Sequence, residues 1–272
     1  MTESLISCNN LKVIDMNTDN HTFRGVFRWP AFLVALLGLL TLVSCGRKPE
    51  SGDPAAFASG WFMHKTEHFT LMDPPDSPRA DHMHSMGEAC EDIYRQLSAL
   101  LDVKVQDRIW IYRFVTASDC QRQTGFPPGT VDGHRIYTRI GAPIGGVIAV
   151  AACEVIAPGH ETFPVVRDGL RKAFDNQTGN VHREASRLRA NDLWVSLSDL
   201  VDTATILDRD IYNTEAASFV AYLIQRHGVP RFKELWASSG ELAAVLERIY
   251  GGSIAQMEED WINHLEREAN RT

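Results

Sequence analysis

The sequence predicts an α+β fold, in which a small N-terminal mixed sheet backed by a long helix is followed by a mostly helical C-terminal half. Short β-rich segments bounded by turn residues lie only in residues 59–160, where they flank one long stretch of helical periodicity. In residues 161–272 the apolar residues recur mainly at helical spacing. We expect the two halves to form one domain, because 272 residues with 44% apolar composition suffice for one good core.

The net charge argues against one class of partner. The chain carries a formal charge of -8, and residues 1–45 contain three acidic and three basic residues, so the remainder carries all of that charge. A surface that follows a phosphate backbone needs the opposite sign. We therefore expect no nucleic-acid partner.

Residues 1–45 have the pattern of a lipoprotein signal peptide. Arg24 and Arg28 precede an apolar run over 31–43, which has the length of a signal-peptide core and is too short for a comfortable membrane span. The run ends in Leu-Val-Ser-Cys, which resembles the lipobox of bacterial lipoproteins. This resemblance implies that Cys45 becomes the lipidated first residue after cleavage. The alternative is a helix with a buried thiol.

Lipidation implies a protein of the bacterial cell envelope, anchored to a membrane through Cys45. Gly46 follows, and no aspartate stands there to signal inner-membrane retention, so in a Gram-negative cell we expect the outer membrane, facing the periplasm. Residues 46–58 have the composition of a flexible tether. A start at Met16 in place of Met1 would bring the signal peptide to an ordinary length.

Three cysteines remain for the folded domain, namely Cys90, Cys120 and Cys153. In an oxidising compartment an odd number permits at most one disulfide with one thiol left over. We favour three buried thiols, because Cys90 falls on the apolar face of a predicted helix.

The first half is predicted to contain strands around one long helix. Residues 61–72 are strand-like and end at the Asp-Pro-Pro-Asp turn of 73–76, and the long helix starts at Ser77 and Pro78. Its apolar face comprises Met83, Met86, Cys90, Ile93, Tyr94, Leu97 and Leu101. We expect a central strand over 107–115, a short helix over 118–125, and further strands over 134–140 and 146–150.

The helix predicted over 162–174 is the one around which the chain is organised, since strands precede it and helices follow it. Pro164 fits its first turn, and its apolar residues fall on one face. Gly169 lies in that face at a cost of about 1 kcal/mol relative to alanine, which indicates that another backbone comes close there. Asp168 lies off the face, four residues before Lys172, at the spacing of an exposed ion pair.

Five more helices are predicted after it. They cover 181–193, a segment from a cap at Asn213 or Thr214 to Gly228, the segment Pro230 to Trp236, residues 242–249, and a last helix that starts in a capping box of Ser253 and Gln256.

The order of these elements resembles the gluzincin, or peptidase MA-like, metallopeptidases. The most specific pieces are VVRDGL at 165–170 and the later runs YNTEAASFVAYLIQRHG and YGGSIAQMEEDWINHL. In that family one helix carries HExxH and a second carries a glutamate that binds the same zinc. By this resemblance Asp168 stands where the third zinc ligand would be, Val165 where a tryptophan would be, and Arg171 where an alanine would be.

The HExxH motif itself does not occur in the sequence. It works because residues four apart share one helix face, so that two imidazoles reach one zinc while the glutamate activates the bound water. The nearest candidates are His160 with Glu161, followed by Pro164 at the second histidine position, and Cys153 with Glu154.

We therefore expect a lipid-anchored envelope protein with a peptidase-like fold that is non-catalytic, holds no cofactor and binds a polypeptide or envelope ligand. The alternative is a zinc-dependent peptidase or hydrolase with atypical metal ligands from Cys153, His160 and Asp168, and Glu154 or Glu161 as the catalytic glutamate. A purely structural envelope protein is a third interpretation. The sequence contains no Gly-x-Ser-x-Gly elbow, phosphate-binding loop or dinucleotide fingerprint.

Overall fold

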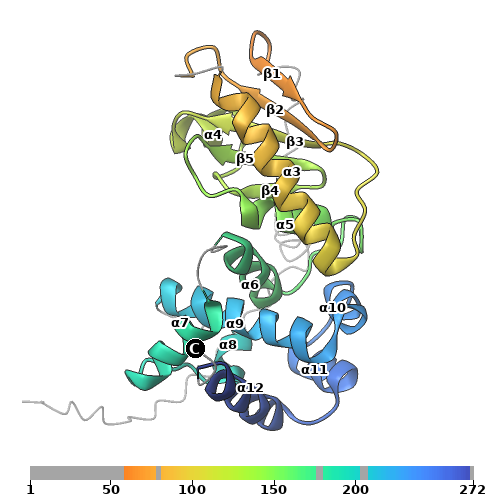
Figure 1. Ribbon diagram of the computed structural model, residues 1–272, viewed down its shortest axis with the longest axis vertical. Helices are drawn as coiled ribbons and strands as arrows, with labels where there is room; N and C mark the ends of the chain where they lie inside the picture. The colour runs from red at the N-terminus through yellow and green to blue at the C-terminus, as the bar shows by residue number, and fades with distance from the viewer. Residues whose placement is uncertain (1–57, 78–80, 176–179, 203–207, 270–272) are drawn as a thin grey trace, which may run out of the picture. The chain divides into compact units, whose positions relative to one another are not determined.

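The computed structural model describes residues 58–77, 81–175, 180–202 and 208–269, all within one compact unit (Figure 1). A small mixed sheet lies within residues 62–139, a long helix packs against it, and the C-terminal half is mostly helical. The predicted α+β fold class is confirmed. The signal peptide, nearly all of the tether and Cys45 lie outside the described residues, so their roles stay predictions.

Five strands form one sheet in the order β1-β2-β3-β5-β4 (Figure 1). They are β1 (Phe62–Lys65), β2 (Phe69–Asp73), β3 (Ile109–Phe114), β4 (Thr130–Asp132) and β5 (Arg135–Arg139). The strands β2, β3 and β5 run parallel, while β1 and β4 pair antiparallel with their neighbours. The carboxyl ends of the three parallel strands therefore lie at the same edge of the sheet.

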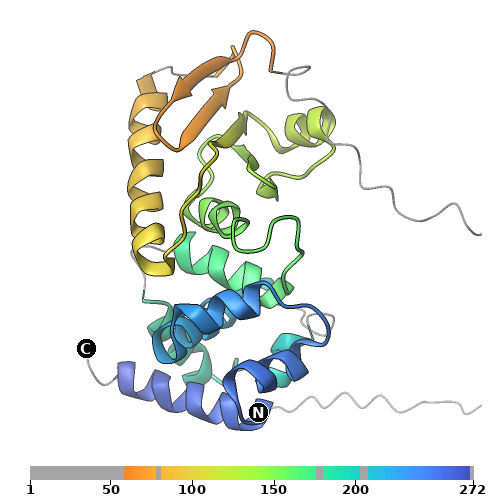
Figure 2. The ribbon, with the colours of Figure 1, turned by 90° about the vertical axis from the view of Figure 1, so that its right-hand side faces the viewer.

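The two faces of the sheet pack against different helices (Figure 2). Helix α3 (Asp81–Leu101) lies on one face, where alternate residues of β2 and β3 join the main core. Helix α4 (Ala117–Thr124) lies on the opposite face, over a smaller cluster of buried residues: Met72, Tyr112, Phe114, Cys120 and Tyr137. This division follows from the alternation of side chains along each strand.

Two strand predictions differ from the structure. The strand predicted over 61–72 is a hairpin of β1 and β2. The strand predicted over 146–150 is wrong, because this segment belongs to helix α5 (Gly145–Cys153), in which all nine residues are buried. A short apolar run is compatible with a buried strand or a buried helix, so periodicity did not distinguish them.

The apolar face predicted for the long helix is confirmed. Cys90, Leu97 and Leu101 are fully buried in α3, and the other members of the set are buried or partly buried in the same core. The prediction of three buried thiols is also confirmed, since all three cysteines of the domain are free and buried. Burial raises the pKa of the Cys90 thiol to about 12, which makes it a poor nucleophile.

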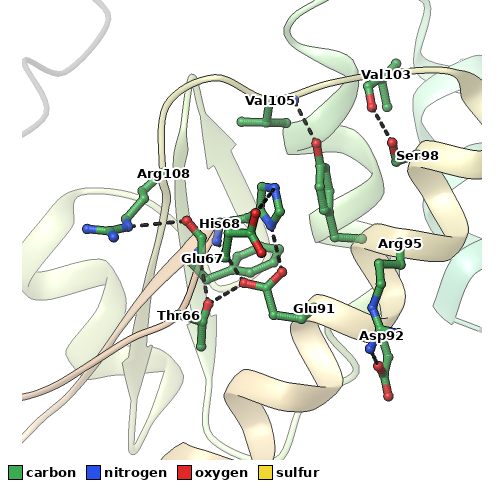
Figure 3. Close-up of polar contacts among 12 residues, drawn as sticks. Thr66, Glu67, His68, Glu91, Asp92, Arg95, Ser98, Val103, Val105 and Arg108 are labelled. Atoms are coloured by element: carbon green, nitrogen blue, oxygen red, sulfur yellow. Dashed lines mark hydrogen bonds and ion pairs between the residues drawn. The ribbon is translucent and has the colours of Figure 1, made fainter.

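Glu91 of α3 forms hydrogen bonds with residues of the turn between β1 and β2 (Figure 3). One carboxylate oxygen accepts hydrogen bonds from the backbone N–H of His68 at 2.8 Å and from Thr66 Oγ1 at 2.5 Å. The other oxygen lies 2.7 Å from His68 Nδ1. Burial alone would raise the pKa of Glu91, but these hydrogen bonds and the adjacent histidine lower it overall. The carboxylate thus attaches the hairpin that carries the edge strand to α3.

Helices make up the second half of the domain. They are α6 (Pro164–Asp175), α7 (Val181–Ala190), α8 (Leu197–Val201), α9 (Arg209–His227), α10 (Val229–Trp236), α11 (Leu242–Tyr250) and α12 (Ile254–Ala269). The predicted start of α9 is five or six residues too late. Asp208 caps this helix, because its carboxylate accepts hydrogen bonds from the backbone N–H groups of Asp210 and Ile211. In the part of the chain that the structure describes, no helix is long and apolar enough to cross a membrane.

Helices α6 and α9 approach each other closely at Gly169. A Cβ atom at this position would lie 2.4 Å from the carbonyl oxygen of Ala216 and 2.7 Å from Cγ2 of Val220. The prediction that another backbone comes close at Gly169 is therefore confirmed. Because α6 also packs on α5, it connects the core behind the sheet to the central helix of the second half.

We expect Gly169→Ala to lower the free energy of unfolding by about 1–3 kcal/mol, because the added methyl group has no space against Ala216. Alanine normally stabilises a helix relative to glycine, so the sign of the change is itself informative. Urea unfolding followed by circular dichroism measures it, with Lys172→Ala on the same helix as the control. A stability equal to or above that of the parent would contradict the close approach.

Candidate ligand-binding site

An open pocket of 660 Å³ lies at the carboxyl ends of the parallel strands, beside the first turns of α3. We call it the strand-end pocket. Its lining residues come from β2 and the turn after it, α3, β3 and the segment after β5: Asp73, Ser77, His82, Ser85, Met86, Ala89, Arg113, Ile140 and Gly141. The volume is in the range of sites for small ligands, and the edge where parallel strands end is a common location for such sites.

The floor of this pocket is polar because the last pair of neighbouring residues on this face of β2 and β3 is charged and not apolar. On the face toward α3, Phe69 lies beside Ile109 and Leu71 beside Ile111 in the parallel register. The next pair along the same face is Asp73 and Arg113, which form a salt bridge. Charged side chains thus occupy positions where a third apolar pair would continue the core.

Asp73 and Arg113 form a buried, two-point ion pair. Arg113 Nε donates to Asp73 Oδ1 at 2.6 Å, and Nη2 donates to Oδ2 at 2.5 Å. The two side chains are 2% and 5% exposed, and Ser77 Oγ adds a hydrogen bond to Oδ2 at 3.1 Å. A buried ion pair seldom makes a protein more stable than apolar residues of the same volume would. Its presence in the floor of a pocket therefore points to a binding role.

Two of the residues on the α3 side of the pocket are small. Ser85 and Ala89 lie four residues apart, hence on one helix face, and both are exposed. Met86 lies beside them and is partly buried against the main core. The short side chains leave the space that the pocket occupies, and Met86 and Ile140 give it apolar walls.

Cys153 and Glu154, one of the candidate metal and catalytic pairs, lie at the end of α5. Cys153 is the last residue of the helix and is fully buried, and burial raises the pKa of its thiol far above its ordinary value. A metal ligand must be a thiolate, which this environment opposes. Glu154 follows as the C-cap residue and is partly exposed.

His160 and Glu161, the other candidate pair, precede α6 in an irregular segment, as expected from the sequence. His160 Nε2 lies 2.9 Å from the carbonyl oxygen of Ser238, in the connection between α10 and α11. Glu161 is exposed. These contacts give His160 the role of attaching the segment before α6 to the second half.

Asp168 forms ion pairs with arginines and not with Lys172, so that predicted pair is wrong. Its carboxylate lies 2.6 Å from Nη2 of Arg209 on α9 and 3.5 Å from Nε of Arg167, and its side chain is 13% exposed. Burial, and next the negative charge of Asp168, raise the pKa of the neighbouring Tyr212. A carboxylate held by two guanidinium groups is already neutralised.

The structure does not bring the candidate zinc ligands together. Within residues 58–77, 81–175, 180–202 and 208–269, no three His, Cys, Asp or Glu side chains form a group that could hold a metal ion. Cys153, His160 and Asp168 each have a different local environment, as described above.

Neither charged residue of the pocket floor, Asp73 nor Arg113, was predicted from the sequence as a site residue. Asp73 was assigned to a turn and Arg113 to the interior of a central strand. A signal was present, because an arginine between apolar residues in the run IWIYRF must find a buried partner. The partner itself depends on the register between β2 and β3, which sequence spacing does not give.

Glu215 of α9 is another buried acid that was not predicted from the sequence. The residue is fully buried, and its Oε1 accepts a hydrogen bond from the backbone N–H of Val195 at 3.1 Å. Its Oε2 has no hydrogen-bond partner among the described residues. Burial raises the pKa of Glu215 to about 8, since it outweighs the hydrogen bond from Val195, and the nearby Glu258 carboxylate adds to the rise.

Comparison with protein families, with curated proteins and with solved structures finds no match for this chain. The resemblance to gluzincins stays a prediction from the sequence runs and the order of elements. What that similarity implies for activity stays a proposal.

We expect Arg113→Met and Asp73→Leu each to cost about 3–5 kcal/mol of folding free energy, because each leaves one charge buried without its partner. The double variant is expected to recover most of that loss, since it removes both charges together. Urea unfolding of the four proteins completes the double-mutant cycle. Single variants within about 0.5 kcal/mol of the parent would contradict a buried pair.

We expect Glu215→Gln to flatten the dependence of stability on pH. The folded-state pKa of about 8 lies above the ordinary value of 4.5, so the folded protein holds this proton more tightly than the unfolded chain. The parent is therefore expected to lose stability as the pH rises from about 5 through about 8, whereas the glutamine variant lacks this contribution. Melting temperatures across that range measure the difference, and parallel curves for the two proteins would contradict a buried, protonated Glu215.

Proposed function

We propose that this chain is a lipid-anchored protein of the bacterial cell envelope whose domain binds a polypeptide or envelope ligand in the strand-end pocket without cleaving it. The observation that carries the proposal is the pocket floor. A buried ion pair of Asp73 and Arg113 at the ends of parallel strands is costly for folding and well placed for binding. Attachment through Cys45 follows from the lipobox-like sequence.

The environment of α5 supports a non-catalytic role. By the gluzincin resemblance, the helix before the Asp168 helix is the one that would carry HExxH. In this chain that helix is α5, with the sequence GGVIAVAAC, and it packs on α6 with all its residues buried. Its side chains contribute to the core in positions where a peptidase would place imidazoles and a carboxylate.

The environment of Asp168 points in the same direction. A zinc-binding carboxylate needs its lone pairs for the metal and is often oriented by one further hydrogen bond. Asp168 instead bonds Arg209 on α9 and lies beside Arg167, so it links α6 to α9. We infer that the position aligned with the third zinc ligand has a structural role in this chain.

The proposal predicts no zinc-dependent peptide cleavage. We expect the purified full-length chain, dialysed against trace zinc, to retain much less than one zinc per molecule by elemental analysis. We also expect peptide libraries to be left intact with or without a chelator. Asp168→Ala is expected to lower stability, through loss of the Arg209 contact, and to leave the zinc content unchanged.

Two results would overturn the non-catalytic interpretation. One is near-stoichiometric zinc that falls in the Asp168→Ala variant, and the other is peptide cleavage that a chelator abolishes. Either result would favour the alternative of a zinc hydrolase with atypical ligands. Cys153→Ser and His160→Gln would then identify the other ligands.

A further inference from the structure

The strand-end pocket has walls and a floor of different chemistry. The walls include the apolar groups of Met86, Ala89 and Ile140, and the floor includes Asp73 and Arg113. Walls of this kind suit an apolar side chain, and the floor decides which polar group comes with it.

The two charges on the floor cancel. Among the described lining residues other than His82, the acidic and basic ones are Asp73 and Arg113, which are paired with each other. A ligand with a carboxylate would bring a second negative charge next to Asp73, and a ligand with an ammonium group would bring a second positive charge next to Arg113. Charge complementarity therefore favours an uncharged ligand group.

The floor nevertheless has hydrogen-bond donors and acceptors that the ion pair does not use. A guanidinium group has five N–H donors, and within the described part of the chain the hydrogen bonds of the Arg113 side chain go to Asp73 through two of them. The Asp73 carboxylate accepts these two and one from Ser77, which leaves acceptor capacity on Oδ1. The floor can thus donate and accept at adjacent points.

An amide is the neutral group that matches this arrangement, because its carbonyl oxygen accepts and its N–H donates. We propose that the strand-end pocket binds an internal segment of a polypeptide, with one peptide group on Arg113 and Asp73 and the adjoining apolar side chain between α3 and Ile140. This inference rests on the proposed binding function. It specifies that the bound ligand is an internal segment of a polypeptide and not one of its termini. A chain terminus binds less favourably because of its charge.

The test compares three probes that differ only in terminal charge. They are N-acetyl-Ala-Leu-Ala-amide, the same peptide with a free carboxylate, and Ala-Leu-Ala-amide with a free ammonium group. Ligand-observed NMR titrations of the purified full-length chain measure the dissociation constants. We expect the fully capped peptide to bind at least about tenfold more tightly than either charged form.

Variants locate the binding. Ala89→Trp fills the pocket from an exposed position of α3, and Ser85→Phe repeats the test one turn away if that variant folds poorly. Leu100→Trp is the matched control, because Leu100 is 49% exposed on the same helix and is not a lining residue. We expect both pocket variants to weaken binding of the capped peptide at least about tenfold and the control to leave it unchanged.

The outcomes separate this inference from the function on which it rests. Tighter binding of the free acid or the free amine, binding that Ala89→Trp and Ser85→Phe leave unchanged, or no binding of the capped peptide would each overturn the inference. Chelator-sensitive cleavage of the bound peptide, detected by mass spectrometry of the same samples, would overturn the non-catalytic function whichever probe binds best.

Discussion

The close contact between α6 and α9 is the constraint on which the rest of the domain depends. Gly169 allows the backbone of α6 to reach the carbonyl of Ala216, and α9 is the helix around which α7, α10 and α12 are arranged. On its other side α6 packs against α5, which in turn contacts α3. Helix α6 therefore contacts both α5, which packs behind the sheet, and α9, the central helix of the second half. A larger residue at position 169 would push α6 away from α9 within the main core.

The strand-end pocket interrupts the apolar packing between α3 and the sheet. Rows of apolar residues cover the sheet under α3, and the last row is replaced by Asp73 and Arg113. The two hydrogen bonds within the pair offset part of the cost of burying both charges. What remains unsatisfied faces a pocket with apolar walls. The proposed preference for an uncharged peptide group is a direct consequence of this charge balance.

The second half contains a separate set of buried polar residues that has a structural explanation. His182 of α7 lies 3.0 Å from Ser218 Oγ on α9, and Trp261 of α12 donates to the same hydroxyl oxygen at 3.2 Å. Burial lowers the pKa of His182, with a further contribution from the nearby His264. A neutral imidazole and an indole N–H sharing one hydroxyl fix the relative rotation of three helices. Burial raises the pKa of Glu215 in the same helix α9.

Much of the fold was predictable from local patterns, and the sites were not. The amphipathic period of α3, the glycine in α6 and the capping residues of the last helix are local signals, so the fold class, the buried thiols and the close helix approach followed from sequence. The all-apolar run of α5 was misassigned because burial on every side removes periodicity. The partners in the ion pairs could not be predicted in this way, because Asp73 and Arg113 are forty residues apart in the sequence and Asp168 and Arg209 are forty-one apart. Only the strand register and the packing of α6 on α9 bring these charges together, because Coulomb attraction selects among partners that tertiary structure has already placed within reach.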